Sequence, residues 1–255
     1  MKAVAKKIID KLGYKITKND GLIDNNGIPA DIVDPVFIKL YTECQPFSFT
    51  SIEPLYSLYQ SVKYIINNNV PGDFVECGVW KGGSAMLIAK TLLNLAVTNR
   101  KIYLYDTYEG MSEPSAKDVD FKDEAADKLL DSSDKFNEKS VWCYSSIDEV
   151  KNNLFSTNYP AENLIFIKGK VEDTIPQSIP GKISLLRLDT DWYESTYHEF
   201  VHLYPLLSIQ GVLIIDDYGH WKGAREATDN YFKENNIRIM LNRIDYTVRV
   251  GIKNE

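Results

Sequence analysis

The sequence is poor in cysteine and has no long apolar run. Its three cysteines, Cys44, Cys77 and Cys143, are far apart and form no CxxC pair. This spacing argues against a disulfide framework or a zinc site and favours free thiols in a reducing compartment. No apolar segment approaches the ~20 residues that a membrane-spanning helix needs. We therefore expect a cytoplasmic protein without a membrane span.

A basic stripe and an apolar leader are also missing. The net charge of the 255 residues is −7, and nucleic-acid-binding proteins carry clustered positive charge, so we expect no nucleic-acid partner. Lys6 and Lys7 stand where a signal peptide would be apolar. Val4, Ile8 and Leu12 share one face of a predicted short helix, which we expect to pack on the domain.

The composition that is present suits one large α/β domain, because 44% of the residues are hydrophobic. Residues 1–50 lack the strand–helix alternation seen later, and we predict an N-terminal cap or lid there. Residues 51–255 are predicted as the main domain. Within it, residues 113–139 are charged and read as a partly helical insertion, with a solvated surface helix as the alternative.

Two acidic residues follow the most apolar stretch of the chain. Residues 183–196 read ISLLRLDTDWYEST, and the run up to Leu188 predicts a central parallel strand buried on both faces. Asp189 and Asp191 come directly after it. Residues two apart on a strand face the same side, so both should line one crevice at the strand's carboxyl end, where open α/β sheets bind ligands.

A second acidic strand end follows. Residues 211–218 read GVLIIDDY and place Asp216 and Asp217 at the end of another buried strand. If the two strands are neighbours, up to four carboxylates converge, and their mutual repulsion would be relieved by a hard cation. For each pair alone, a helix cap or a solvated loop is the alternative interpretation.

A glycine-rich turn follows the first predicted strand, residues 73–79. Residues 76–84 read ECGVWKGGS and lead into a helix. Gly78 would allow the turn, Gly82 and Gly83 would let a ligand approach the backbone, and the helix N-terminus offers free amides. The spacing is neither the G-x-G-x-x-G dinucleotide fingerprint nor a P-loop.

Asp106 ends the second predicted strand, residues 101–107. An acid in this place can accept hydrogen bonds from ribose hydroxyls, and a helix cap is the alternative. Residues 171–175 are predicted as a further strand end at the same edge. Two C-terminal segments, residues 237–242 and 247–252, predict a β-hairpin.

The three histidines allow more than one interpretation. His198 and His202 are four apart on a predicted helix and share a face, which favours a surface or core position over metal binding. His220 follows the acidic pair and is the better candidate for contact with a substrate or for support of metal ligands. A purely structural role for His220 is equally open.

Five strands with intervening helices, a terminal hairpin and the Glu-x-Gly-x-x-x-Gly turn resemble the class I, Rossmann-like fold of S-adenosylmethionine-dependent methyltransferases. That fold implies a mostly parallel central sheet with a C-terminal antiparallel hairpin and helices on both faces. The segments ECGVWKGGS, LYDTYEGM, LLRLDTDWYEST and GVLIIDDYGHWKGAREA resemble the macrocin-O-methyltransferase family. The resemblance covers Thr50 to the end of the chain.

The resemblance implies a magnesium-dependent transfer of a methyl group from S-adenosylmethionine to a hydroxyl of a sugar or glycoside, by a homo-oligomer. It implies Asp189, Asp216 and Asp217 as the Mg²⁺ ligands and Asp191 as the catalytic general base. We add His220 as a second candidate catalytic residue because it follows the acidic pair. The cofactor would be held by Glu76, Cys77, Gly78, Gly82, Ser84, Asp106, Thr107, Glu172, Asp173 and Asp189. The rival interpretations are a metal-dependent phosphoesterase and a non-catalytic S-adenosylmethionine-binding protein.

Overall fold

The computed structural model describes residues 27–255, so the predicted helix through Val4, Ile8 and Leu12 lies outside the described residues. The chain divides into two compact units, residues 1–38 and 39–255, and the second holds the sheet. No helix in the described part is long and apolar enough to cross a membrane.

Helix α2 (Pro35–Cys44) begins at the predicted proline. The carboxylate of Asp34 accepts hydrogen bonds from the amides of Val36 and Phe37 at 3.0 and 3.3 Å. These bonds satisfy amides that have no partner within the first turn of a helix, which explains why the helix begins here.

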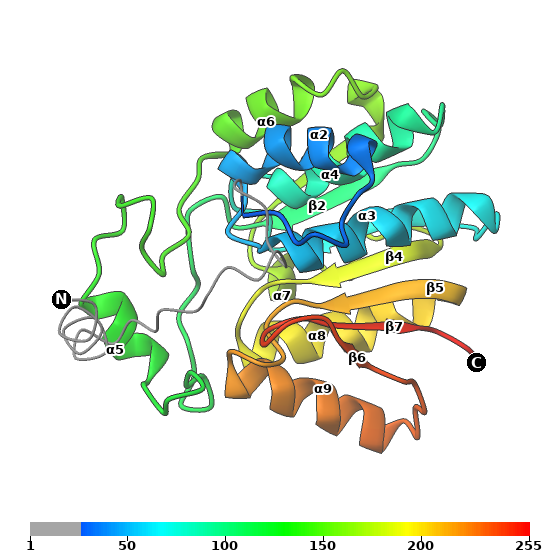
Figure 1. The fold of residues 1–255 in the computed structure, drawn as a ribbon. Helices are drawn as coiled ribbons and strands as arrows, with labels where there is room; N and C mark the ends of the chain where they lie inside the picture. Colours follow the sequence, from blue (N-terminus) through cyan, green and yellow to red (C-terminus); the bar gives the residue numbers. More distant parts are fainter. Residues whose placement is uncertain (1–26) are drawn as a thin grey trace, which may run out of the picture. The chain divides into compact units, whose positions relative to one another are not determined.

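The core of the larger unit is a seven-stranded sheet with the order β3-β2-β1-β4-β5-β7-β6 (Figure 1). The first five strands in this order are parallel, whereas β7 is antiparallel to both β5 and β6. The predicted mostly parallel sheet with an antiparallel C-terminal hairpin is therefore confirmed. The strands are β1 (Asp73–Cys77), β2 (Ile102–Asp106), β3 (Leu164–Lys168), β4 (Ile183–Leu188), β5 (Leu207–Ile215), β6 (Asn242–Arg243) and β7 (Arg249–Ile252).

Helices cover both faces of the sheet, as predicted (Figure 1). One face carries α3 (Ile52–Asn67), α4 (Gly83–Asn94) and α6 (Ile147–Phe155), and the other carries α7 (Val171–Thr174), α8 (Tyr193–Leu203) and α9 (Lys222–Glu234). The predicted insertion contains α5 (Ala126–Asp131). Three short 3₁₀ turns complete the elements: η1 (Gln45–Phe47), η2 (Ala161–Asn163) and η3 (Tyr204–Leu206).

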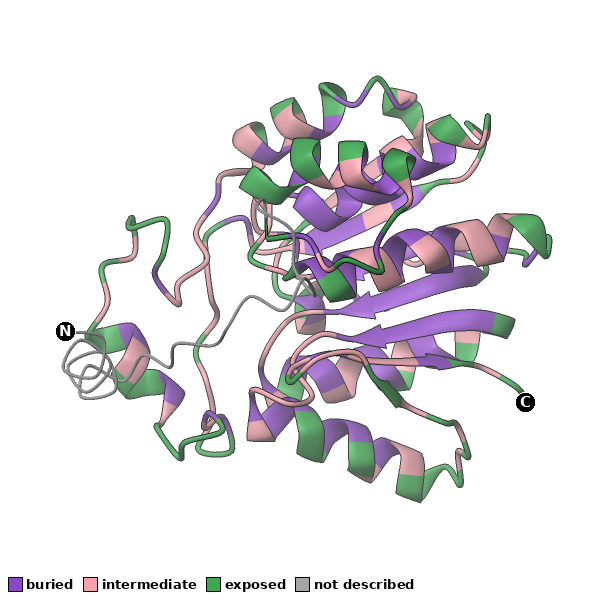
Figure 2. Ribbon diagram, in the orientation of Figure 1, coloured by how far each residue is buried: buried purple, intermediate pink, exposed green. Residues whose placement is uncertain are grey.

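The central strands are almost fully buried, as Figure 2 shows for β4 and β5. Every residue of β4 is buried, which fits a strand covered by helices on both faces. Leu186 and Leu213 pack with Phe200 of α8 in one apolar cluster on the side of that helix. This packing fixes the positions of the strand ends at which the acidic residues lie.

Several boundaries differ from the sequence-based expectation. Strand β1 ends at Cys77 rather than at residue 79, because Gly78 takes a φ of +82° and turns the chain out of the sheet. Residues 171–175 follow the end of β3 at the predicted edge of the sheet, but Val171–Thr174 is a short helix. The first arm of the hairpin is only two residues long.

Candidate active site

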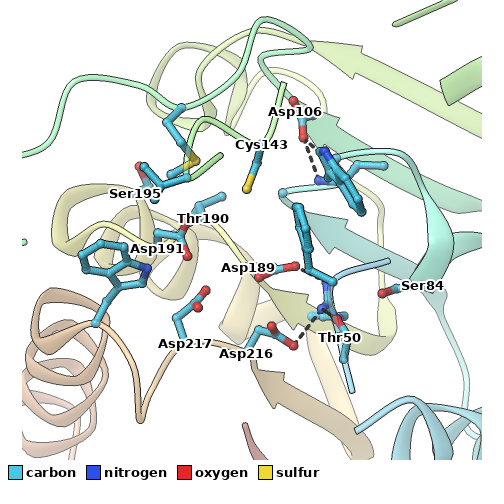
Figure 3. A pocket seen from close by; sticks show the side chains of 18 of the residues that line it. Thr50, Ser84, Asp106, Cys143, Asp189, Thr190, Asp191, Ser195, Asp216 and Asp217 are labelled. Carbon is cyan, nitrogen blue, oxygen red and sulfur yellow. Dashed lines mark hydrogen bonds and ion pairs between the residues drawn. The ribbon is translucent and has the colours of Figure 1, made fainter. Parts of the chain in front are cut away.

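A cavity of about 450 Å³ opens at the carboxyl ends of β1, β2, β4 and β5 (Figure 3). This is the edge at which the sequence places the glycine-rich turn and both acidic pairs. Ser84 and Asp106 line one part of the cavity, whereas Asp191 and Asp217 line another (Figure 3). The volume is that of a typical small-molecule site.

Asp106 orders the glycine-rich turn. Its Oδ2 accepts hydrogen bonds from the amides of Val79 at 2.7 Å and Trp80 at 3.2 Å, and its Oδ1 accepts one from the amide of Tyr108 at 2.6 Å. Trp80 has a φ of +47°, which the loop must sustain although it is not a glycine. Asp106 therefore has a structural role in addition to lining the cavity.

The glycines of this turn make room for protein atoms. A Cβ on Gly78 would lie 1.8 Å from the carbonyl oxygen of Asp189, and one on Gly83 would lie 2.6 Å from the carbonyl oxygen of Phe47. A Cβ on Gly82 would lie 2.6 Å from the Leu154 side chain. Close packing of the chain is therefore one reason for glycine at positions 82 and 83, and close approach of a ligand to Gly83, which lines the cavity, stays a prediction.

The cavity wall includes about half of the residues that the sequence links to a cofactor. Glu172 is held in the wall by a hydrogen bond of 2.7 Å that its Oε1 accepts from Ser195 Oγ. The predicted residues that line the cavity are Gly78, Ser84, Asp106, Thr107, Glu172 and Asp189. Those that do not line it are Glu76, Cys77, Gly82 and Asp173.

A tight turn brings Asp189 and Asp191 together. The Asp189 amide donates to the Cys77 carbonyl at 2.8 Å, and the Trp192 amide donates to the Thr190 carbonyl at 2.7 Å. Asp191 lies beyond the strand with a φ of +66°, so the two carboxylates converge through a left-handed residue rather than through strand alternation. Asp189, Asp191 and Asp217 each offer an oxygen within 4.8 Å of the others.

Arg187 is the main counter-charge of this region and was not singled out in the sequence. Its side chain is 3% exposed. Nη1 donates to Glu76 Oε1 at 2.7 Å and to Asp189 Oδ2 at 2.5 Å, and Nη2 donates to Asp216 Oδ1 at 2.7 Å. An arginine inside an otherwise apolar, buried strand is the signal that could have revealed it, because such a charge needs buried partners.

One guanidinium does not neutralise all the carboxyl groups. Burial, the largest cause, raises the pKa of Glu76 to about 7 even though Arg187 opposes the shift. Burial also raises the pKa of Asp191 to about 7. The pKa of Asp217 is raised by burial and by the negative charges of Asp191 and Asp216. Oδ2 of Asp217 is buried and has no hydrogen-bond partner among the described residues. A divalent cation would satisfy this oxygen and the excess negative charge.

The predicted histidines separate into two groups. His220 lines the cavity, its Nδ1 lies 3.3 Å from the Tyr246 hydroxyl, and burial lowers its pKa. His198 and His202 are not among the cavity-lining residues, and His198 Nε2 lies 2.9 Å from the carbonyl oxygen of Ile175. Only His220 is therefore placed to contact a ligand in this cavity.

Connections outside the sheet close the rest of the cavity. They are residues 110–112 after β2, Lys139 at the end of the predicted insertion with Ser140, Val141 and Cys143 after it, and residues 245–247 in the C-terminal hairpin. Cys143 is among the side chains that line it (Figure 3). Residues 47–50 at the end of the predicted cap, and Ser51 at the start of the predicted main domain, contribute another wall.

Residues 45–250 match the family model "Macrocin-O-methyltransferase (TylF)". Among characterised relatives, the chain is 32% identical over 194 residues to the demethyldecarbamoylnovobiocin O-methyltransferase of Streptomyces niveus, covering 76% of this chain and 71% of that protein. It is 30% identical over 200 residues to an 8-demethyl-8-(2,3-dimethoxy-alpha-L-rhamnosyl)-tetracenomycin-C 4'-O-methyltransferase of Streptomyces olivaceus, covering 78% and 73%.

Solved structures show the same fold. The O-methyltransferase NovP superposes with a TM-score of 0.72 at 26% identity, covering 93% of this chain and 89% of that chain. The calicheamicin methyltransferase CalS11 superposes with a TM-score of 0.60 at 14% identity, covering 94% and 98%. The class I methyltransferase fold expected from the sequence is therefore confirmed.

Proposed function

Because this chain belongs to the macrocin O-methyltransferase family and is an O-methyltransferase, we propose that it methylates a hydroxyl of a sugar within a glycosylated natural product or saccharide. The observation that carries this proposal is one cavity that is bounded both by the glycine-rich turn and by the carboxylates of Asp189, Asp191 and Asp217. One part suits a methyl donor, and the other suits the activation of a hydroxyl acceptor.

The proposed methyl donor is S-adenosylmethionine. Asp106 is a carboxylate in the donor part of the wall, to which the first turn of α4 contributes Gly83 and Ser84. Glu172 also lines the cavity, with its Oε1 held by Ser195 Oγ. Carboxylates can accept hydrogen bonds from ribose hydroxyls, and the start of a helix supplies backbone donors. Glu76 supports this site from behind, since it is buried against Arg187 and does not line the cavity.

The proposed metal is Mg²⁺, held by Asp189, Asp216 and Asp217. The unpartnered Oδ2 of Asp217 supports a cation here, and oxygen ligands suit magnesium. Asp216 would have to exchange its ion pair with Arg187 for the metal, whereas Asp191 already lies with Asp189 and Asp217. Asp191 is thus the competing third ligand. When bound, Mg²⁺ would supply Lewis-acid stabilisation of negative charge on the acceptor oxygen.

Asp191 is the proposed general base. Its pKa of about 7 suits proton removal near neutral pH, because a base is most effective when its pKa lies close to the working pH. His220 lies in the same cavity and is proposed to contact the acceptor. Its ring nitrogen faces the Tyr246 hydroxyl, which would orient the imidazole.

Two measurements test the proposal. Calorimetry should detect S-adenosylmethionine binding with and without a chelator, because Ser84, Asp106 and Glu172 lie on elements other than the two acidic strand ends. Incubation with a panel of glycosides should give a product heavier by one methylene group, and chelation should stop its formation. Absence of S-adenosylmethionine binding would contradict the proposed methyl donor. Binding without turnover on any glycoside would contradict the proposed sugar acceptor.

A further inference from the structure

A buried acid on α8 lies behind the acidic turn. Glu199 is 0% exposed, and its Oε1 accepts a hydrogen bond of 3.0 Å from Thr190 Oγ1. Its Oε2 is buried without a hydrogen-bond partner among the residues that the structure describes. An unpartnered buried oxygen disfavours folding, so a residue of this kind calls for a compensating role.

Thr190 connects this acid to the reacting part of the cavity. It stands between Asp189 and Asp191 and lines the cavity with both of them. Its carbonyl oxygen accepts a hydrogen bond from the Trp192 amide, which helps to close the turn. The turn includes Asp191 in a left-handed conformation, a state that costs free energy for a residue with a side chain and that needs support from its surroundings.

Glu199 also lies near the end of β1. The thiol of Cys77, the last residue of that strand, interacts with the Glu199 carboxyl group, and burial raises the pKa of Glu199 well above the ordinary value. The Cys77 carbonyl in turn accepts the hydrogen bond from the Asp189 amide. One buried side chain thus joins α8 to the end of β1 and to the acidic turn.

We propose that Glu199 is a positioning residue that anchors Thr190 and so holds Asp189 and Asp191 in the arrangement that binds a divalent cation. The inference rests on the proposed metal site. Groups that hold metal ligands from behind typically contribute ~10–100-fold to metal affinity. Neither Ser84 nor Asp106 shares a hydrogen bond with Glu199, so we expect the anchoring to leave the part of the cavity that they line unchanged. Glu172 interacts with Glu199 through charge repulsion.

The test is calorimetric titration with Mg²⁺, with Mn²⁺ as a second probe, on the full chain. Glu199→Ala and Thr190→Val each remove the hydrogen bond from one side, and each should weaken cation binding by about tenfold or more. The double variant should be no weaker than either single variant, because both remove the same interaction. Glu199→Gln and Thr190→Ser keep an acceptor and a donor, and both should bind within about threefold of the unchanged protein.

Titration with S-adenosylmethionine is the control in every variant, and its affinity should not change. If the unchanged protein binds neither cation, the proposed metal site fails, and this inference fails with it. If that protein binds a cation but Glu199→Ala and Thr190→Val do so equally well, only the inference about Glu199 is overturned. Loss of affinity for both cation and S-adenosylmethionine would indicate a general structural role and would also overturn it.

Discussion

Asp216 and Asp217 are adjacent in the chain and have opposite electrostatic surroundings. Asp216 accepts a hydrogen bond of 2.7 Å from the Arg187 guanidinium, whereas Oδ2 of Asp217 is buried without a partner in the described part of the chain. The strand ends at Ile215, so the chain turns between the two carboxylates and sends them to different neighbours. The proposed metal site can therefore have one of two ligand sets: Asp189 and Asp217 with either Asp216 or Asp191 as the third ligand.

Asp216→Asn and Asp191→Asn distinguish the two ligand sets. If Asp216 binds the metal, its replacement should weaken Mg²⁺ binding about as much as Asp189→Asn does, and excess Mg²⁺ should restore part of the rate. Asp191→Asn should then leave Mg²⁺ affinity near that of the unchanged protein but lower turnover by roughly 10²–10⁴, the contribution of a positioned base. The measurement is turnover and calorimetry against Mg²⁺ concentration. The reverse pattern would assign the third ligand to Asp191.

Arg187→Met should destabilise the fold strongly in the presence of a chelator. It leaves Glu76, Asp189 and Asp216 without their buried counter-charge, and breaking a buried ion pair in this way costs ~3–5 kcal/mol. Urea unfolding measures the change in the free energy of unfolding. Lys168→Met is the control, because its ion pair with Glu109 is exposed and should matter little. Equal effects of the two variants would contradict the role assigned to Arg187.

Glu76→Gln should change how stability depends on pH. The folded-state pKa of Glu76 is raised to about 7, so between about pH 4.5 and 7 the folded chain binds more protons than the unfolded chain. The protonated Glu76 therefore contributes its full share of stability below about pH 4.5, the pKa in the unfolded chain, and this share is lost as the pH rises through about 7. Relative to the unchanged protein, Glu76→Gln should therefore gain stability over this range, by up to about 3 kcal/mol.

The measurement for Glu76→Gln is urea unfolding at several pH values without divalent cations. Asp173→Asn, at a position that does not line the cavity, serves as a comparison. A stability difference between Glu76→Gln and the unchanged protein that stays constant with pH would show that Glu76 is already ionised in the folded chain.

Gly78→Ala should prevent stable folding. Its Cβ would lie 1.8 Å from the Asp189 carbonyl oxygen, and the residue has a φ of +82°, so both crowding and backbone strain oppose the substitution. We expect a loss of more than about 3 kcal/mol. Gly181→Ala is the matched control, since nothing lies within 4 Å of its Cβ, and its effect should stay within about 0.5 kcal/mol. Thermal or urea unfolding checks both variants.

The sequence predicts the sheet well because apolar continuity is a strong signal. The run from Ile183 to Leu188 can only be accommodated between two layers of helices, and the structure buries every residue of it. The same pattern places the strand ends, and hence the acidic residues, at one edge of the sheet. Residues 171–175 lacked such a signal, and the helix Val171–Thr174 that follows the end of β3 was not predicted.

The details of the site depend on contacts that a sequence does not reveal. Strand alternation suggests that Asp189 and Asp191 share a side, but they converge because Asp191 takes a left-handed conformation after the strand has ended. The pairing of Arg187 with Asp216 joins residues 29 positions apart. Glu199 is one of two acids on its helix, and its burial and its bond to Thr190 distinguish it from Glu194.

The carbonyl of Asp189 occupies the space that a side chain at position 78 would need, so the donor loop and the acidic turn are in contact through their backbones. Residues 110–112 and the connection that contains Lys139, Ser140, Val141 and Cys143 close the cavity from outside that contact. Exchanging these two connections with those of a relative should change which acceptor is bound, while residues 245–247 stay in place because Tyr246 lies beside His220. The architecture therefore offers an engineering route to new acceptors that is separate from the chemistry.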